Sequence, residues 1–279
     1  ILVKPLARVT KAIEDLTDGY QQDEICVPDY TETELITDAF NKMLARMKVL
    51  DESRSEFVSN VSHELKTPMT SMKVLADSLV GQQGVPEELY QEFMHDITAE
   101  IDRENRIITD LLTLVKMDKK NADLQIQHMS INQLLEDILK RLRPIADKRS
   151  IDLILDSFRP VEADVDELKF TSAISNLVEN AIKYNVDDGW VRVSLDADHK
   201  YFYVTVADSG MGIPEDSLSR IFERFYRVDK SHSREIGGTG LGLAITRSTI
   251  GMHHGVIKVF SKEGEGTTFS VRVPLSYIP

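Results

Sequence analysis

The feature that most constrains the fold is a helical pattern that runs from Glu32 to Gly81 and Gly84 almost without a break. Apolar side chains recur there at steps of three and four residues, which is the spacing of a coiled-coil seam. An isolated helix of this length would leave the seam in water, so the pattern predicts packing against partner helices. The seam consists of Phe40, Met43, Met47, Leu50, Arg54, Val58, Val61, Leu65, Pro68, Met72, Leu75 and Leu79.

A second helical pattern follows the turn at residues 81–86 and fades near Lys119 and Lys120. The two patterns together predict a helical hairpin, because a short turn places successive helices side by side and antiparallel. One hairpin cannot bury two seams of this length, so we predict a homodimer in which two hairpins form a four-helix bundle. The apolar positions of the second pattern are Leu89, Phe93, Ile97, Ile101, Ile108, Leu111, Leu112 and Val115.

The front of the chain carries a shorter helical pattern over residues 5–16 and a polar connector over residues 20–31. The first residues, Ile1, Leu2 and Val3, are apolar. They fit either the end of a membrane span from which a cytoplasmic fragment was cut, or the buried first turn of an ordinary helix. The sequence contains no run of about 18 apolar residues, the length that a membrane-spanning helix needs.

The composition excludes several classes of function. There are 46 acidic and 33 basic residues, so the net charge of −13 repels nucleic acid. The single cysteine, Cys26, excludes an internal disulfide framework and a cysteine-based zinc cluster, and it favours a reducing compartment. The apolar share of 42% rules out a chain that is disordered throughout.

From residue 124 onward, short strand patterns alternate with helical patterns, which predicts an α/β sandwich. A long polar and glycine-rich stretch over residues 208–242 interrupts the alternation. The predicted strands cover residues 124–128, 151–155, 191–195, 201–207, 256–260 and 268–273, and the predicted helices cover residues 131–148, 166–184 and 244–252.

His63 occupies a distinctive place in the long helical pattern. It lies between the core positions Val61 and Leu65, so its side chain is predicted to face solvent. Thr67 follows one turn later on the same face, and Pro68 removes a backbone donor and is expected to bend the helix. On position alone, His63 could be only a solvated surface side chain.

The residues around this histidine carry a resemblance. Residues 57–68 read Phe-Val-Ser-Asn-Val-Ser-His-Glu-Leu-Lys-Thr-Pro and closely resemble the phosphoacceptor box of bacterial sensor histidine kinases. The resemblance implies that His63 accepts a phosphoryl group from ATP and that Glu64 acts as a base or orients the ring. It also implies that Thr67 helps to position water when phosphate is removed from a partner protein. A neutral imidazole offers a nucleophilic nitrogen near neutral pH, so the chemistry is sound by itself.

Four segments of the back half carry a second set of polar residues. In the first segment, Asn176, Asn180 and Lys183 fall along one flank of a predicted helix. Amide oxygens can hold a hydrated magnesium ion, and an ammonium group can meet phosphate oxygens. Taken alone, this segment could also be an amphipathic helix with its polar side toward water.

The next two segments offer one carboxylate and two guanidinium groups. Asp208 directly follows a predicted strand and precedes Gly210 and Gly212. A carboxylate at that place can accept a hydrogen bond from an adenine amino group while the glycines let the backbone approach the ring. A simple turn is the alternative. The aromatic and cationic segment that follows could present Arg224 or Arg227 to a phosphate.

The fourth segment, residues 237–245, is a glycine-rich loop that leads into a predicted helix, an arrangement that suits phosphate binding. It is not a P-loop, because no Gly-Lys-Ser or Gly-Lys-Thr ends it. It is not a dinucleotide fingerprint either, because it follows a polar loop rather than a strand. The candidate phosphate-binding residues of this loop are Gly238, Thr239, Gly240, Leu241 and Gly242.

In order, the four segments resemble the asparagine, first glycine, phenylalanine and second glycine boxes of one ATP-binding fold. Histidine kinases, DNA gyrase, the heat-shock 90 chaperones and the mismatch-repair protein MutL share this fold. The resemblance implies Asp208 on the adenine, Asn180 on magnesium, Asn176 and Lys183 near the phosphates, and a lid over residues 228–236. The other nucleotide contacts that it implies are the glycine-rich loop, Tyr184, Gly210, Gly212, Arg227 and Thr267.

The front end resembles a HAMP signalling linker, a module in which two helices per chain form a parallel bundle beside a membrane span. The alternative is a plain coiled-coil leader, which would leave the polar connector unexplained. The predicted domains are therefore a HAMP-like linker at 1–52, a dimerisation and histidine phosphotransfer hairpin at 53–122, and an ATP-binding catalytic domain at 123–279. The resemblance to HAMP rests on Pro5, Gly19, Glu34, Leu35, Phe40, Asn41, Lys42 and Met43.

Together, these resemblances imply the cytoplasmic portion of a sensor histidine kinase, anchored to a bacterial membrane through a segment outside this chain. Such a protein uses ATP and Mg²⁺, phosphorylates its own His63, transfers the phosphate to an aspartate of a response regulator, and also acts as a phosphatase toward that regulator. The expected partners are a second copy and the receiver domain of the regulator, with no nucleic acid. Two alternatives remain, namely an ATP-binding relay that transfers nothing and an ATPase of the gyrase or chaperone type.

Overall fold

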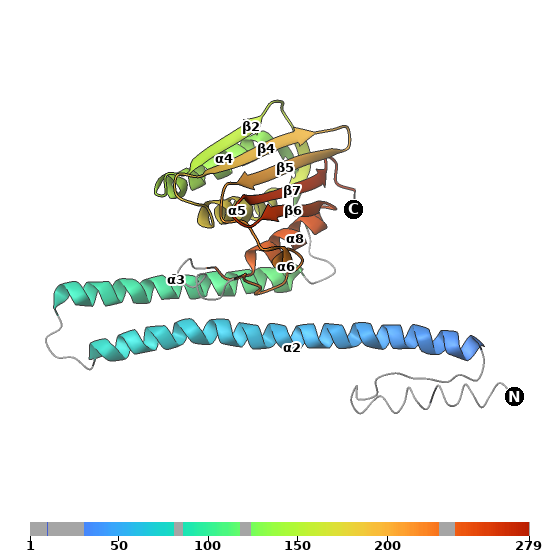
Figure 1. Cartoon of the computed structure of the whole chain (residues 1–279), viewed down its shortest axis with the longest axis horizontal. Coiled ribbons are helices and arrows are strands. Elements are labelled where there is room, and N and C mark those ends of the chain that lie inside the picture. The colour runs from blue at the N-terminus through green and yellow to red at the C-terminus, as the bar shows by residue number, and fades with distance from the viewer. Residues whose placement is uncertain (1–9, 11–30, 81–85, 118–123, 229–237, 279) are drawn as a thin grey trace. The chain divides into compact units, whose positions relative to one another are not determined.

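The computed structural model describes residue 10 and residues 31–80, 86–117, 124–228 and 238–278. Except for residue 10, the predicted front helix lies outside these residues, as does most of the predicted lid. The structure divides into two compact units between His63 and Glu64. The elements are labelled in Figure 1.

Two long helices come first along the chain. Helix α2 spans Thr31–Val80 and continues through Pro68, and helix α3 spans Glu87–Met117. Acidic residues in the first turn of α3 and Lys116 in its last turn complement the helix dipole. The prediction of two long helices in succession is confirmed, and residues 81–85 of the predicted turn lie outside the described residues. The apolar seam of α3 includes side chains that are exposed in the single chain, namely Leu89, Ile101, Ile108, Leu112 and Val115.

The remainder of the described chain is an α/β sandwich, as predicted. Its main sheet has five strands in the order β2-β4-β5-β7-β6. Strands β2 and β4 are parallel and the other neighbours are antiparallel. Helices α4, α5 and α8 cover one face of this sheet (Figure 1). The strands are β2 (Asp152–Ser157), β4 (Trp190–Ala197), β5 (Tyr201–Asp208), β6 (Val256–Lys262) and β7 (Gly266–Pro274), and the helices are α4 (Ile131–Asp147), α5 (Glu167–Lys183), α6 (Glu215–Leu218) and α8 (Gly242–Met252).

A two-stranded antiparallel sheet completes the domain. It joins β1 (Ile126–Ser130) to β3 (Glu162–Asp166). The sequence did not predict β3, because the strand is short and acidic, and such a composition is unfavourable in strands. Residues 162–166 form a strand because they pair with β1, not because of their own strand preference.

The core lies between the sheet and the three helices. Phe170 of α5 meets Phe202 of β5 edge to face, with ring centroids 5.6 Å apart. His253 at the end of α8 is also buried, and burial lowers its pKa. Its Nε2 accepts a hydrogen bond from the backbone N–H of Asp166, and its Nδ1 lies 2.8 Å from the carbonyl oxygen of Thr249. Through its two ring nitrogens, His253 therefore connects the end of α8 to the start of α5.

Candidate active site

The site begins with Asp208, the last residue of β5. Its Oδ1 accepts hydrogen bonds from the backbone N–H groups of Gly210 and Thr267, at 2.9 and 3.1 Å. Its Oδ2 makes no hydrogen bond with any described residue. Burial raises the pKa of this carboxyl, and the two backbone donors oppose that effect. One oxygen is thus fixed by the protein, and the other can accept a hydrogen bond from a ligand.

The loop after Asp208 runs close to the end of α5. A Cβ atom on Gly210 would lie only 2.4 Å from the carbonyl oxygen of Tyr184. Gly212 has a φ of +70°, and a Cβ there would lie 2.0 Å from the carbonyl oxygen of Lys262. These two positions therefore require glycine. As predicted, Gly210 and Gly212 form a backbone turn beside the carboxylate.

Thr267, at the start of β7, closes the other side of this turn. Its hydroxyl lies 2.9 Å from that of Ser261 on β6. The Ser261 hydroxyl also accepts a hydrogen bond from the backbone N–H of Ile213. Ser261 was not predicted as part of the site, because only the pairing of β6 with β7 places it opposite Thr267.

Helix α5 places the predicted amides and cation along one side. Asp166 caps its N-terminus by accepting a hydrogen bond from the backbone N–H of Lys169. Asn176 lies against the start of α8, because a Cβ on Gly242 would sit 3.2 Å from its amide oxygen. Asn180 follows one turn later and is partly exposed.

Lys183, at the last position of α5, is the most perturbed cation of the site. A Cβ on Gly238 would lie 3.1 Å from its Nζ, so the ammonium group is beside the glycine-rich loop. Burial and, after it, the positive charges of Arg227 and Arg106 lower the pKa of Lys183 to about 8. Several cations therefore gather at this end of α5, and Arg106 belongs to α3. An anionic ligand would relieve their mutual repulsion.

The phenol of Tyr184 lies beside the same cations. The Nζ atom of Lys183 is 5.4 Å from the centre of the tyrosine ring. Burial raises the pKa of the phenol, so the group is neutral near neutral pH. The structure thus brings Tyr184 and Lys183 together at the end of α5.

The glycine-rich loop enters α8 and also contacts α3. The Thr239 hydroxyl donates a hydrogen bond of 2.9 Å to Asp110 of α3 and accepts one from the backbone N–H of Leu241. Burial raises the pKa of Asp110, whereas the bond from Thr239 opposes the rise. Leu241 packs with Leu114 of α3 in a small apolar cluster. The sequence did not predict this contact, because it joins positions that are far apart in the chain.

The predicted phosphoacceptor residues all lie within α2. His63 and Thr67 are exposed, and Glu64 is partly exposed. The prediction that the His63 side chain reaches the surface is confirmed. Residues four positions apart in a helix lie on the same face, so Thr67 lies on the same face of α2 as His63.

A magnesium ion fits the donor set beside Lys183. No group of three or more His, Cys, Asp or Glu side chains suited to a metal occurs among the described residues. Mg²⁺ is usually held by one or two protein oxygens together with waters and the phosphates of the substrate. The amide oxygen of Asn180 can supply such a ligand.

Two family models match the chain in succession. Residues 53–120 match the model of the His Kinase A (phospho-acceptor) domain. Residues 165–277 match the model of the Histidine kinase-, DNA gyrase B-, and HSP90-like ATPase. Sensor histidine kinase WalK of Bacillus subtilis (strain 168) is 35% identical over 228 residues, covering 81% of this chain and 37% of that relative.

The chain belongs to the bacterial sensor histidine kinases. Sensor protein kinase WalK of Staphylococcus aureus is also 35% identical, over 232 residues that cover 82% of this chain. The kinase spans 55% of the length of that relative. The histidine kinase ThkA, solved in complex with response regulator protein TrrA, has the same fold with a TM-score of 0.66. That match is 23% identical and covers 89% of this chain and 68% of ThkA. In the described part of the kinase, no helix is both long and apolar enough to span a membrane.

Proposed function

We propose that this kinase binds Mg–ATP between Asp208 and the end of α5 and transfers the γ-phosphoryl group to His63. The observation that carries the proposal is the pairing of one carboxylate oxygen that is open to a ligand with a cluster of cations. The first suits the adenine amino group, and the second suits the triphosphate. This pairing supports a nucleotide site over an ordinary turn beside an amphipathic helix.

The residues of the site have separate roles in this proposal. Oδ2 of Asp208 accepts a hydrogen bond from the adenine amino group, and Gly210 and Gly212 let the backbone approach the ring. Lys183 and Arg227 neutralise phosphate charge. The remaining roles are orientation of the base by Thr267, phosphate contacts from Asn176 and Tyr184, magnesium coordination by Asn180, and a backbone cradle from Gly238, Thr239, Gly240, Leu241 and Gly242 at the start of α8.

The transfer step itself needs a nucleophile and a proton acceptor. A neutral imidazole nitrogen of His63 attacks the γ-phosphorus, the bond to the bridging oxygen breaks, and ADP leaves. Glu64, the next residue, accepts a proton from the ring or fixes its orientation. Magnesium, when bound, neutralises charge that develops on the phosphate oxygens.

The partners follow from the same family. We propose that the phosphoryl group moves on to an aspartate of a response regulator and that Thr67 helps to position water in the reverse, phosphatase reaction. ThkA, which has this fold, was solved with such a regulator. Homodimerisation is supported by the exposed apolar seam of α3. A HAMP-like linker at 1–52, a phosphotransfer hairpin at 53–122 and a catalytic domain at 123–279, anchored at the cytoplasmic side of the membrane, complete the proposal.

The proposal is tested by labelling with ATP that carries a radioactive γ-phosphate. The wild-type protein is expected to become labelled, and His63→Gln is expected to remain unlabelled. His95→Gln is the matched control, because His95 is another exposed histidine on a long helix, and it should label normally. ATP hydrolysis without label on the protein would support an ATPase instead, and ATP binding with neither reaction would support a silent relay.

A further inference from the structure

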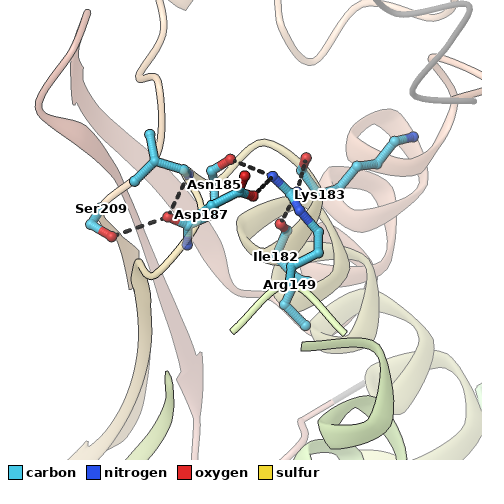
Figure 2. A network of polar contacts seen from close by, with 7 residues as sticks. Arg149, Ile182, Lys183, Asn185, Asp187 and Ser209 are labelled. Carbon is cyan, nitrogen blue, oxygen red and sulfur yellow. Dashed lines mark hydrogen bonds and ion pairs between the residues drawn. The ribbon is translucent and has the colours of Figure 1, made fainter. Parts of the chain in front are cut away.

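Arg149 lies outside every segment that resembles a nucleotide box, yet it binds the end of α5. It follows α4 and precedes β2. Its Nη1 donates hydrogen bonds to the carbonyl oxygens of Ile182 and Lys183, both at 2.8 Å. Its Nη2 donates to the carbonyl oxygen of Asn185 at 2.9 Å and forms an ion pair with Asp187 at 3.3 Å (Figure 2). One guanidinium group thus donates hydrogen bonds to three carbonyl oxygens at the C-terminal end of α5.

Two of these carbonyls, of Ile182 and Lys183, belong to the last turn of α5, where a helix leaves its C=O groups without intrahelical partners. The carbonyl oxygen of Ile182 also accepts a longer hydrogen bond, of 3.4 Å, from the backbone N–H of Asn185. The carbonyl of Tyr184, between those of Lys183 and Asn185, accepts a hydrogen bond of 3.1 Å from the backbone N–H of Met211. Four successive carbonyls, residues 182 to 185, are therefore bound from two sides. Arg149 holds three of them, and the loop after Asp208 holds the fourth.

The buried side chain of Asn185 connects the two sides. Its Oδ1 accepts a hydrogen bond of 3.0 Å from the hydroxyl of Ser209, the residue after Asp208 (Figure 2). Its Nδ2 donates to the carbonyl oxygen of Trp190 at 3.0 Å. The backbone N–H of Trp190 in turn donates to the Ser209 hydroxyl at 2.8 Å. A continuous network runs from Arg149 to the residue beside the adenine-binding candidate.

We infer that Arg149 is a positioning residue for nucleotide binding, which fixes the distance between Lys183 and Asp208. The inference rests on the proposed function, because these two groups are there assigned to opposite ends of ATP. Arginine suits the role because its planar fork can meet several carbonyls at once, whereas a lysine ammonium on a flexible stem cannot hold the same geometry. Hydrogen bonds from a charged donor are also about twice as strong as neutral ones.

The test compares Arg149→Met and Arg149→Lys with the wild-type kinase. Dissociation constants for a non-hydrolysable ATP analogue with Mg²⁺ are measured by calorimetry well below the melting temperature. We expect the dissociation constant to increase about tenfold for Arg149→Met, which corresponds to the loss of about one charged contact with the nucleotide. The increase should be smaller for Arg149→Lys. In autophosphorylation, KM for ATP should rise more than kcat falls.

Hydrogen exchange supplies a readout that does not depend on activity. The amide of Met211 should exchange faster in Arg149→Met, because its acceptor on Tyr184 is no longer held in place. Ser209→Ala, which leaves Arg149 intact, should weaken ATP binding in the same direction and to a smaller extent. This variant keeps the inference testable if Arg149→Met fails to fold.

Arg159→Met is the matched control. Arg159 forms an ion pair with Asp196 at 2.5 Å on the same domain, and its loss should leave ATP affinity unchanged. Folded Arg149 variants that bind ATP as the wild type does would overturn the inference and leave the proposed function intact. A wild-type protein that binds no ATP would overturn both.

Discussion

The pKa of Lys183 gives the kinase a specific dependence on pH. Burial and neighbouring arginines lower this pKa from 10.5 to about 8. With that value, about nine-tenths of the ammonium is charged at pH 7 and about one-tenth at pH 9. Bound phosphate favours the charged form and raises the pKa in the complex. The affinity for ATP should therefore fall roughly tenfold between pH 7 and pH 9, the loss arising from deprotonation of the free protein.

Calorimetry over this pH range, at constant ionic strength, measures the effect. Lys183→Arg is the matched variant, because a guanidinium stays charged throughout, and its affinity for ATP should be nearly independent of pH. Adenosine is the matched ligand, because it has no phosphate, and its affinity should not follow the titration. The reasoning is refuted if the wild-type affinity for ATP is constant to pH 9, or if Lys183→Arg loses affinity to the same extent.

Three further predictions concern the turn beside β5 and the contact with α3. Gly210→Ala would place a Cβ 2.4 Å from the carbonyl oxygen of Tyr184, so we expect ATP affinity to fall by at least about tenfold in calorimetry, and an unchanged value would contradict the close approach. Asp208→Asn can turn an amide N–H toward the adenine amino group, so it should weaken ATP binding by about tenfold or more while GTP binding, the control, changes less. Thr239→Val removes a donor to Asp110, whose pKa burial raises, and should lower the free energy of unfolding by about 1 kcal/mol at pH 7. The loss of unfolding free energy in Thr239→Val should become smaller as the pH falls and Asp110 becomes protonated. Urea unfolding of the variant and the wild type at two pH values measures this change.

Helix and strand boundaries were largely predictable from the sequence, because they depend on local patterns. The long helix α2 follows from a nearly continuous seam that ends before Gly81, and β5 follows from an alternating sequence pattern, which the structure shows as alternation of buried and partly buried residues. Strand β3 was missed because its residues disfavour a strand, and only pairing with β1 orders it. Local preference thus decides most elements, and tertiary contacts decide the exceptions.

The site was predictable to the extent that motifs are local. Asp208, Gly210 and Gly212 lie close together in the sequence, so a contact with adenine could be proposed from their spacing, with a simple turn as the alternative. The close approach of Gly210 to Tyr184 could not, because it depends on how α5 packs beside β5. The same holds for Arg149, which reaches the end of α5 from a loop more than thirty residues earlier. No local pattern marks a guanidinium group that binds distant carbonyls.

The most direct test of the central claim is the intact mass of the protein after incubation with ATP and Mg²⁺. The account predicts one added phosphoryl group per chain, on His63, that is lost in acid and retained in base. His63→Gln should gain no mass under the same conditions. An added group that survives acid, or one that also appears on His63→Gln, would contradict the assignment of His63 as the phosphoacceptor.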